Sequence, residues 1–594
     1  MTPFLRRDGR GQRLLLILGV WLVTIILAGC SSQTDRMWLN APDWSRAQFV
    51  GETAAGARPI FALGPDNSAT FLLVDSQGGR TYPKAVSFDG QGLKRWEVAY
   101  PQISMARPDK PRAYWADGAV QVFWISNQQL YHAQLNPANG QMAEPPHKLS
   151  GEIWVEDYAV AVDHQGRLVV WFAGPRIEPG LYRLTDNALT GKPELIDPAG
   201  IRPTLAFDAD DALHAIWIHY PMGKTNVTIF YTPDALTGPA PDATSIIAEP
   251  KAALGSLFAG PIMGLTSGRV YIFWSVEIRT GVAAGSVDSR YMHFPLGRPQ
   301  EATSPIQLFL PSGYHLPYEE WLDSGFRAGR RSPLVPPRTG KVTQIYPHSS
   351  DAPELVTIQR ELVQFTMRDS SFQIGVLFFD EGQPDSYQLL SFTGGDSRWP
   401  YITSDADRWL YASWLERGAV EGFRIVYAST NPDIVTSFAK LSAEDYQTLA
   451  AQTLFGLVSS ALLLPFVFMW MIAPIFLYLI TFPLRRNQEG ELTPGVLISL
   501  GVSIGGYWVA KLGFLGGLTG YVPFSAWLPI IPEWMALPLQ IGVPAIILGL
   551  GLLVAWLFTY KRENPSSLLF LVFYLAVDGV LSVAIYGPII LATN

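Results

Sequence analysis

The chain has 594 residues and a formal net charge of −8, is 48% hydrophobic and 16% charged, and contains one cysteine. Its length allows roughly three or four domains, or one large repeat domain with additions. A single cysteine excludes an intramolecular disulfide framework and a zinc site built on two thiolates, and the composition excludes a mostly disordered chain. The negative charge argues against a nucleic-acid partner.

The N-terminal segment is typical of a secretory signal. Four arginines lie within the first 13 residues, an apolar run covers residues 14–27, and the run ends in Leu27-Ala28-Gly29-Cys30. These four residues resemble a bacterial lipobox, and the resemblance implies cleavage before Cys30 and diacylglycerol on its sulfur. We expect a lipoprotein signal peptide over residues 1–29 and an anchor and linker over residues 30–57. An uncleaved signal anchor is the alternative.

Residues 58–440 carry a repeat of short β-rich runs. Two copies match closely: one runs from Pro203 through Asp208 to Trp217, and the other from Pro400 through Asp405 to Trp414. Looser copies end at Trp124, Trp171 and Trp274, and weaker copies reach Tyr82 and Tyr387. A tyrosine follows each of the five tryptophans after a gap of variable length: Tyr131, Tyr182, Tyr231, Tyr291 and Tyr427.

This unit predicts a small antiparallel sheet. Proline begins a strand where its missing N–H does no harm, and aspartate and glycine form the tight turn that follows. Alternation at period two before the tryptophan buries one face of the sheet. Because one sheet of about four strands cannot cover its own faces, about seven copies predict an all-β propeller of about seven blades. A β-sandwich pair is the alternative.

The turn signature resembles the Asp-box repeats of sialidase/BNR-type propellers. Ser87-Phe88-Asp89-Gly90-Gln91-Gly92, followed by Trp96, resembles an Asp box with altered spacing. The resemblance concerns blade shape, and the aspartate turn is structural in such families, so it transfers no activity.

Three arginines recur beside the repeat prolines: Arg58, Arg112 and Arg202. They are candidate ligand-binding residues, because a guanidinium pairs with a carboxylate through two hydrogen bonds, although a structural role in each blade is the alternative. A sialidase-like site would add Glu156 and Tyr158. The spacing of histidines and acids predicts no metal site, and no motif predicts a cofactor or a catalytic residue.

Residues 295–350 interrupt the repeat and widen the gap between copies by about 50 residues. Long insertions in a scaffold often carry function, so we expect this segment to cap the propeller or contact a partner. A disordered excursion is the alternative.

Residues 441–594 predict an α-helical transmembrane bundle of about four helices. Apolar stretches of spanning length lie near residues 457–484, 494–518, 537–560 and 566–592. Arg485-Arg486 follows the first stretch and Lys561-Arg562 the third, which places these loops in the cytoplasm and residues 31–450 outside it. Lys511 and Asp578 are expected to form an intramembrane charge pair, with an ion or proton path as the alternative.

These patterns predict a multi-pass, lipid-anchored protein of the bacterial cell membrane with an extracytoplasmic propeller. Its expected function is binding or scaffolding of a protein or glycan partner. The lipid bilayer is a further expected partner, and a nucleic acid is not expected. The alternatives are a sialidase-like glycan hydrolase and a subunit of a membrane transport or envelope complex.

Overall fold

The chain folds into two compact units in a computed structural model, one within residues 41–440 and the other within residues 464–593. The structure describes residues 41–593 apart from 42, 185–188, 238–243, 254, 312–319, 322–324, 335–337, 365–369, 392–395, 418–421, 440–463, 482–492, 515–534 and 560–565. Cys30 and the predicted signal peptide lie outside these residues.

The first unit contains seven antiparallel sheets in its described residues. Six are four-stranded, and one has two further strands at its outer edge. Blades one to three comprise β2 (Ala62–Leu63), β3 (Ala69–Gln77), β4 (Arg80–Phe88), β5 (Lys94–Ala99), β6 (Asp109–Ala116), β7 (Ala119–Ser126), β8 (Gln129–Leu135), β9 (His147–Lys148), β10 (Asp157–Val162), β11 (Leu168–Ala173), β12 (Leu181–Arg183) and β13 (Glu194–Asp197).

The remaining blades follow in chain order, and a strand from the start of the chain completes the last one. They comprise β14 (Ile201–Phe207), β15 (Leu213–His219), β16 (Thr228–Thr232), β17 (Ser245–Ala248), β18 (Ser256–Leu265), β19 (Arg269–Ile278), β20 (Val287–Pro295), β21 (Ile306–Gln307), β22 (Glu320–Trp321), β23 (Arg330–Pro333), β24 (Val342–His348), β25 (Leu355–Gln364), β26 (Ser370–Asp380), β27 (Gln383–Leu389), β28 (Arg398–Ser404), β29 (Leu410–Arg417), β30 (Phe423–Ser429) and β1 (Gln48–Thr53). Two short 3₁₀ helices connect strands, η1 (Ala235–Thr237) and η2 (Pro299–Glu301).

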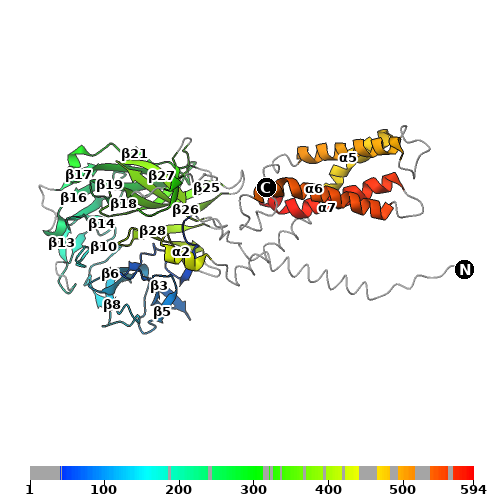
Figure 1. The fold of residues 1–594 in the computed structure, drawn as a ribbon. Coiled ribbons are helices and arrows are strands. Elements are labelled where there is room, and N and C mark those ends of the chain that lie inside the picture. Colours follow the sequence, from blue (N-terminus) through cyan, green and yellow to red (C-terminus); the bar gives the residue numbers. More distant parts are fainter. Residues whose placement is uncertain are drawn as a thin grey trace. The chain divides into compact units, whose positions relative to one another are not determined.

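The blades form a closed ring. Figure 1 shows the colours running from blue through cyan and green to yellow around the unit, so that β28 lies near β3. β1 pairs with β30, so the first strand of the chain completes the seventh blade. Phe61 and Phe71 of the first blade then pack with Tyr411 and Tyr427 of the seventh. The seven-bladed propeller is therefore confirmed, and the β-sandwich alternative is wrong.

The five repeat tryptophans occupy the second strands of their blades, and the tyrosines that follow them occupy the third strands. Trp124, Trp171 and Trp414 are almost fully buried, and Trp124 stacks on Tyr131 with ring centroids 5.9 Å apart. These aromatic side chains fill the space between neighbouring sheets, which is why each copy of the repeat folds only against the next.

The repeat prolines lie at a β-bulge in the innermost strands. The register shifts between Asp109 and Arg112 in β6, and the same shift recurs in β14, β18 and β28. The residue before the proline adopts a positive φ, for example 53° at Arg202. The bulge leaves one residue unpaired and re-aims the side chains that follow, and proline tolerates such a position because no ladder bond is needed there.

Aspartates hold the tight turns between strands. Asp208 Oδ1 accepts hydrogen bonds from the backbone N–H groups of Asp210 and Ala212, and Asp163 does the same in the third blade. Asp89 of the segment resembling an Asp box accepts from Gln91 N and Leu93 N, at the turn between β4 and β5. These carboxylates replace backbone partners, as an Asx turn does.

The interruption at residues 295–350 contains strands. It supplies β21 to the fifth blade, β24 as the innermost strand of the sixth, and β22 and β23 at the outer edge of the sixth. Arg331 of β23 is 1% exposed and forms a salt bridge with Glu354. A short helix, α2 (Pro432–Phe438), ends the unit and is capped by Asn431.

The second unit contains four helices in its described residues: α4 (Leu464–Ile480), α5 (Pro494–Phe514), α6 (Ala536–Thr559) and α7 (Ser567–Thr593). By length and composition, two spans can cross a bilayer, Leu537–Thr559 and Ser567–Tyr586. The structure thus supports two candidate spans where the sequence predicted about four. The described part of α4 is short, and Lys511 with several glycines and serines lowers the hydropathy of α5.

Candidate functional site

Three tyrosines from the innermost strands meet at the axis of the propeller. Tyr114 comes from β6, Tyr346 from β24 and Tyr401 from β28, and the rings of Tyr346 and Tyr401 lie 5.2 Å apart. The three side chains interact electrostatically with Arg112, and Tyr401 also interacts with the other two phenols. Burial raises the pKa of Tyr114 to about 12, so its hydroxyl stays protonated near neutral pH.

The predicted arginines lie on or beside the innermost strands, and each binds a carbonyl of another blade. Arg112 Nη1 donates to Tyr158 O at 2.6 Å, and Arg202 Nη1 donates to Phe258 O at 2.6 Å. Arg58 Nε donates to Pro400 O at 2.7 Å, and its guanidinium covers the ring of Tyr346 at 4.5 Å. These contacts join blades around the ring.

One carboxylate of the protein itself faces all three arginines. Asp157 interacts electrostatically with Arg58, Arg112 and Arg202, and its Oδ1 lies 3.0 Å from Lys110 Nζ and 3.7 Å from Arg112 Nη2. Burial alone would raise the pKa of Asp157, but Lys110 and Arg112 together hold it below its usual value. Asp157 is therefore ionised, and it balances charge that a ligand carboxylate would otherwise meet.

The other two candidates for a sialidase-like site do not form a nucleophile pair. The hydroxyl of Tyr158 lies 2.5 Å from Lys110 O and 3.2 Å from Phe123 O, and the Tyr158 side chain is buried beneath Arg112. Glu156 is exposed, and its backbone carbonyl accepts from Lys110 Nζ. Burial raises the pKa of Tyr158 well above its usual value, which makes it a poor nucleophile.

A cavity of about 340 Å³ extends from the three tyrosines to the turns that follow the innermost strands. Its wall includes segments of β10, β14, β18, β24 and β28, with His348 at the end of β24, and the adjoining residues Asp163, Asp208 and Asp351. His348 Nε2 lies 2.9 Å from Ser404 Oγ. Burial lowers the pKa of His348 to about 4, so its ring is neutral near pH 7.

Two of the three aspartates in this wall already have side-chain partners. Asp163 Oδ2 accepts from Arg167 Nε at 2.8 Å, and Asp208 Oδ2 lies 3.1 Å from His214 Nε2. His214 Nδ1 in turn lies 2.7 Å from the Tyr231 hydroxyl, and this chain of contacts is buried. Within the described ranges, His, Cys, Asp and Glu side chains form no group of three that could hold a metal ion.

The helical unit contains the predicted pair of charges. Lys511 Nζ of α5 lies 2.6 Å from Asp578 Oδ2 of α7, and Asp578 is 0% exposed. The same oxygen accepts from the Tyr507 hydroxyl at 2.6 Å and lies 3.4 Å from Ser582 Oγ. These contacts connect α5 and α7 through a buried polar cluster.

The axial tyrosines and His348 were not among the predicted site residues. A signal exists for Tyr401, because it directly follows a repeat proline at the bulge, as the predicted residue Arg112 does in the second blade. In the sixth blade Ile345 stands where other copies have proline, so the position of Tyr346 could not be aligned from that residue.

No protein-family model matches the chain, and no curated protein matches it. Among solved structures, the chain is similar to the polysaccharide lyase Uly1, with 9% identity over 64% of this chain and 90% of that one and a TM-score of 0.40. It is also similar to a Trypanosoma rangeli sialidase, with 13% identity over 64% of this chain and 61% of that one and a TM-score of 0.34. An endo-arabinase from Bacteroides thetaiotaomicron shares 12% identity over 47% of this chain and 94% of that one, with a TM-score of 0.26. These likenesses concern the propeller fold.

Proposed function

We propose that this chain is a membrane-anchored binding module whose propeller takes a glycan at its axis. The observation that carries the proposal is the axial cavity, which has Tyr114, Tyr346 and Tyr401 at one end and open turns at the other. Phenol rings offer flat apolar faces and protonated hydroxyls, and a sugar ring presents C–H faces and hydroxyls that match both. A neutral His348 adds one more hydrogen-bonding group.

Binding fits the site better than hydrolysis. Most glycoside hydrolases use two carboxyl groups, one on each side of the scissile bond, whereas a sialidase uses a tyrosine nucleophile together with an acid. In the described wall of the cavity, Asp163 and Asp208 are held by turn N–H groups and by Arg167 and His214, which leaves Asp351 as the acid without such partners. Asp157 also balances the arginines that a sialidase-like site would require.

The proposed membrane topology goes beyond the two candidate spans and adds two further spans and an orientation. We place Leu537–Thr559 and Ser567–Tyr586 across the bilayer, with α4 and α5 as two further spans, and the basic loops in the cytoplasm. This arrangement places the propeller outside the cytoplasm, in agreement with a lipidated Cys30. This topology is also compatible with a subunit of an envelope complex. In that case the axial cavity would be the ligand site of the complex.

A glycan array tests the proposal with the full chain in detergent. Arrayed neutral and carboxylate-bearing oligosaccharides supply the probes, and Tyr346→Phe removes one axial hydroxyl but keeps the ring beneath Arg58. We expect binding to at least one oligosaccharide class, weakened by about threefold to tenfold in Tyr346→Phe, since one hydrogen bond contributes about 1 kcal/mol. Tyr182→Phe, in β12 and stacked on Phe172, is the matched control and should bind as the native chain does.

Two outcomes would contradict the proposal. If the chain bound none of the arrayed oligosaccharides, glycans would be excluded as its ligand class. If the two variants and the native chain bound equally, the binding site would lie away from the axis. Release of free sugar from a bound oligosaccharide would favour the sialidase-like hydrolase.

A further inference from the structure

A line of buried polar side chains follows one face of α5. Residues four apart on a helix lie one above another, and this spacing relates Ser499, Ser503, Tyr507 and Lys511. Each of the four is at most 4% exposed. Polar side chains inside an apolar bundle bond one another or serve a ligand, so the contacts of this line indicate what it does.

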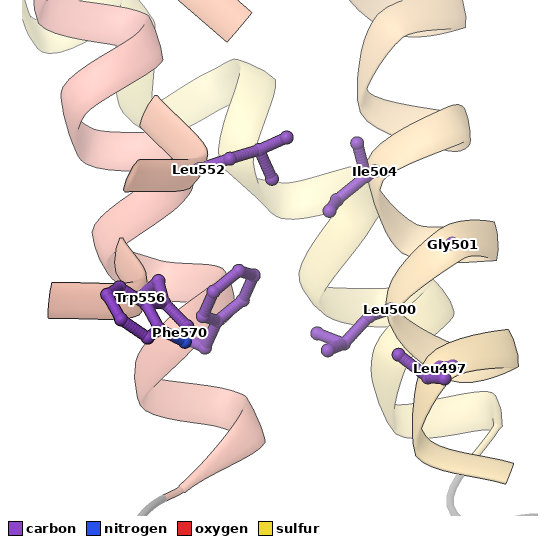
Figure 2. A pocket seen from close by; sticks show the side chains of 7 residues that line it. All are labelled: Leu497, Leu500, Gly501, Ile504, Leu552, Trp556 and Phe570. Atoms are coloured by element: carbon purple, nitrogen blue, oxygen red, sulfur yellow. The ribbon is translucent and has the colours of Figure 1, made fainter. Parts of the chain in front are cut away.

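The polar line is separate from the apolar pocket that α5 forms with α6 and α7. Figure 2 shows Leu500 and Ile504 of α5 facing Leu552, Trp556 and Phe570 across this pocket. The residues that line the pocket have no hydroxyl or carboxyl group, and none of them belongs to the polar line. The groups that can exchange a proton therefore lie elsewhere on α5.

The polar line begins near the ends of two helices. Thr481 directly follows α4 and is partly exposed, and its Oγ1 lies 2.5 Å from Ser499 Oγ, five residues into α5. One turn further along, Ser503 Oγ donates to Ser499 O at 2.8 Å. We call these three side chains the entry hydroxyls, because they lead inward from the end of the unit where α4 ends and α5 begins.

The polar line ends at Asp578 of α7, which keeps one oxygen without a partner. The Tyr507 hydroxyl and Lys511 Nζ both donate to Oδ2, each at 2.6 Å. Oδ1 is buried and has no hydrogen-bond partner in the part of the chain that the structure describes, and the Asp578 side chain is 0% exposed. Oδ1 is thus the atom that can take a proton without displacing the lysine or the tyrosine.

Asp578 and the last entry hydroxyl lie at similar depths from the same end of the unit. The hydroxyls of Tyr478, near the end of α4, and Ser567, the first residue of α7, lie 2.5 Å apart, so α7 begins where α4 ends. Asp578 comes 11 residues after Ser567, about 16 Å along α7 at 1.5 Å per residue. Ser503 comes nine residues after the start of α5, about 14 Å along that helix. A hydrocarbon core is about 30 Å thick, so both residues lie near its middle in the proposed topology.

A charged pair at this depth indicates a role beyond packing. Ionisable residues near the middle of a bilayer are costly and typically mark ion pathways and proton relays. Well-packed apolar residues of similar volume often stabilise a fold as much as a buried ion pair does. The pair of Lys511 and Asp578 therefore fits a function that an apolar contact would not provide.

The titratable groups around this carboxylate leave a proton one place to bind. α5 contributes Lys511 and Tyr507, and α7 contributes Tyr574, whose ring centroid lies 6.1 Å from that of Tyr507. α4 and α6 also pack against α7, and their described residues contain one titratable side chain, Tyr478, near the end of α4. Lysine and tyrosine ordinarily carry their protons at neutral pH, whereas an aspartate has lost its own.

We propose that Asp578 is a proton-binding site of the helical unit and that protons reach its Oδ1 through the entry hydroxyls. Lys511 and Tyr507 hold Oδ2 and keep the carboxylate in place. The proposed topology puts the entrance on the cytoplasmic side. The inference rests on the proposed membrane location and goes beyond the proposed glycan binding, because it assigns a second ligand, a proton, to the other unit of the chain.

Each step of the uptake moves one proton between two oxygen atoms. Thr481 exchanges protons with water because it is partly exposed, and each hydroxyl accepts a proton on its oxygen and passes its own to the next. One bridging water molecule covers the last step, from Ser503 to Oδ1. The carboxylate becomes a neutral carboxyl group, and no electron donor or other reactant takes part.

The test uses dicyclohexylcarbodiimide, a lipid-soluble reagent that reacts with protonated rather than ionised carboxyl groups. Cells that make the full chain supply inverted and right-side-out membrane vesicles with an alkaline, buffered lumen, and the outer medium is then made acidic. Mass spectrometry of the peptide that contains α7 gives the modified fraction. Asp578 is the acidic residue in the sequence of that helix, so the modification is assigned without a variant.

Acid outside inverted vesicles meets the cytoplasmic face, and we expect it to raise the modification of Asp578 by up to about tenfold for each pH unit, as protonation of a single group does. Acid outside right-side-out vesicles should leave the modification unchanged. Ser503→Leu replaces the last entry hydroxyl by an apolar side chain and should abolish the response. Thr559→Leu, at a buried hydroxyl of α6 without a hydrogen-bond partner in the described residues, is the matched control and should respond as the native chain does.

Several results would overturn the inference. Modification that does not depend on pH, no modification at any pH, or an equal response in the two kinds of vesicle would each do so. An unchanged response in Ser503→Leu would exclude the entry hydroxyls as the path. Suppression of the modification by sodium at constant pH would assign the site to a metal cation instead of a proton. The comparison of the two vesicle orientations uses the native chain, so it decides the matter even if Ser503→Leu does not fold.

Membrane fractionation and maleimide labelling separate this inference from the proposed topology. Recovery of the chain outside the membrane fraction would refute both together. A response to acid only in right-side-out vesicles would refute the inference if Arg486→Cys reacts with an impermeant maleimide only after permeabilisation. The same response would refute the topology alone if Arg486→Cys reacts in intact cells. The glycan array is independent of these results.

Discussion

Asp578 concentrates its contacts on one carboxylate oxygen. Lys511 and Tyr507 both bind Oδ2, whereas Oδ1 is buried without a hydrogen-bond partner in the described residues. A buried carboxylate with no cation is costly, so the lysine determines whether α5 and α7 can pack here. The sequence showed both charges and allowed them to meet, because a lysine side chain points back along its helix. The hydrogen bond from Tyr507 to Asp578 could be seen only in the structure.

Lys511→Met should destabilise the helical unit by about 3–5 kcal/mol, because it leaves the Asp578 charge buried and unpaired. The double variant Lys511→Met/Asp578→Asn should recover most of this loss. Thermal unfolding of the full chain in detergent, followed by helical circular dichroism, measures both. Lys148→Met is the control. It breaks an exposed ion pair with Glu152 and should change stability by less than about 1 kcal/mol. A Lys511→Met protein as stable as the native chain would contradict this account.

Glu361 is a second residue whose charge state follows from its surroundings. It is 1% exposed in β25, and the Tyr387 hydroxyl donates to its Oε1. Burial raises the pKa of Glu361 from 4.5 to about 8, although the tyrosine lowers it somewhat. Between these two pH values the folded chain keeps a proton that the unfolded chain has lost, so this residue lowers the free energy of unfolding as pH rises.

Glu361→Gln should therefore flatten the fall in stability between pH 5 and pH 8 by roughly a few kcal/mol. Urea unfolding of the full chain at pH 5, 6.5 and 8 measures the difference. Glu152→Gln, at an exposed glutamate, is the control and should follow the native curve. Parallel curves for the Glu361→Gln protein and the native chain would show that Glu361 is ionised in the fold.

At the scale of single elements, the tight turn after the innermost strand positions the second strand of the blade. Asp208 binds two turn N–H groups with one oxygen and approaches His214 with the other, so it joins the turn to β15. Asp405 has the same role in the seventh blade, where its Oδ2 accepts from the Tyr411 hydroxyl at 2.8 Å. The two copies that matched best in the sequence are thus also alike in their contacts.

Asp208→Ala should destabilise the propeller by about 1–3 kcal/mol, because two turn N–H groups and His214 lose their partner. Asp210→Ala removes an exposed carboxylate from the same turn and should have an effect within about 0.5 kcal/mol. Chemical unfolding of the two variants side by side gives the comparison. Equal stability would show that the carboxylate does not hold the turn.

The repeat predicted the strands well because buried tryptophans, tyrosines and turn aspartates recur at similar places in the chain. The axial site was harder to predict. Arg58, Arg112 and Arg202 were visible beside the prolines, but the facing carboxylate of Asp157 comes from a blade without that proline. Contacts between blades depend on ring closure, which the spacing within one copy cannot show.

At the scale of the whole molecule, one chain contains a β-propeller and a separate unit of apolar helices. The propeller closes through β1 and β30, so its fold requires residues from both of its ends. The helical unit has many exposed large apolar side chains, among them Phe468, Ile472 and Val509, which suit a bilayer. We propose that a closed propeller outside the cytoplasm presents its axial cavity while the helices remain in the membrane.

Labelling with a membrane-impermeant maleimide on intact cells tests this claim most directly. Asp407→Cys places a thiol in an exposed turn of the seventh blade, and Arg486→Cys places one in the loop assigned to the cytoplasm. The account predicts that Asp407→Cys reacts in intact cells and that Arg486→Cys reacts only after permeabilisation, above the background of the native chain with Cys30. Labelling of Asp407→Cys only after permeabilisation would contradict it.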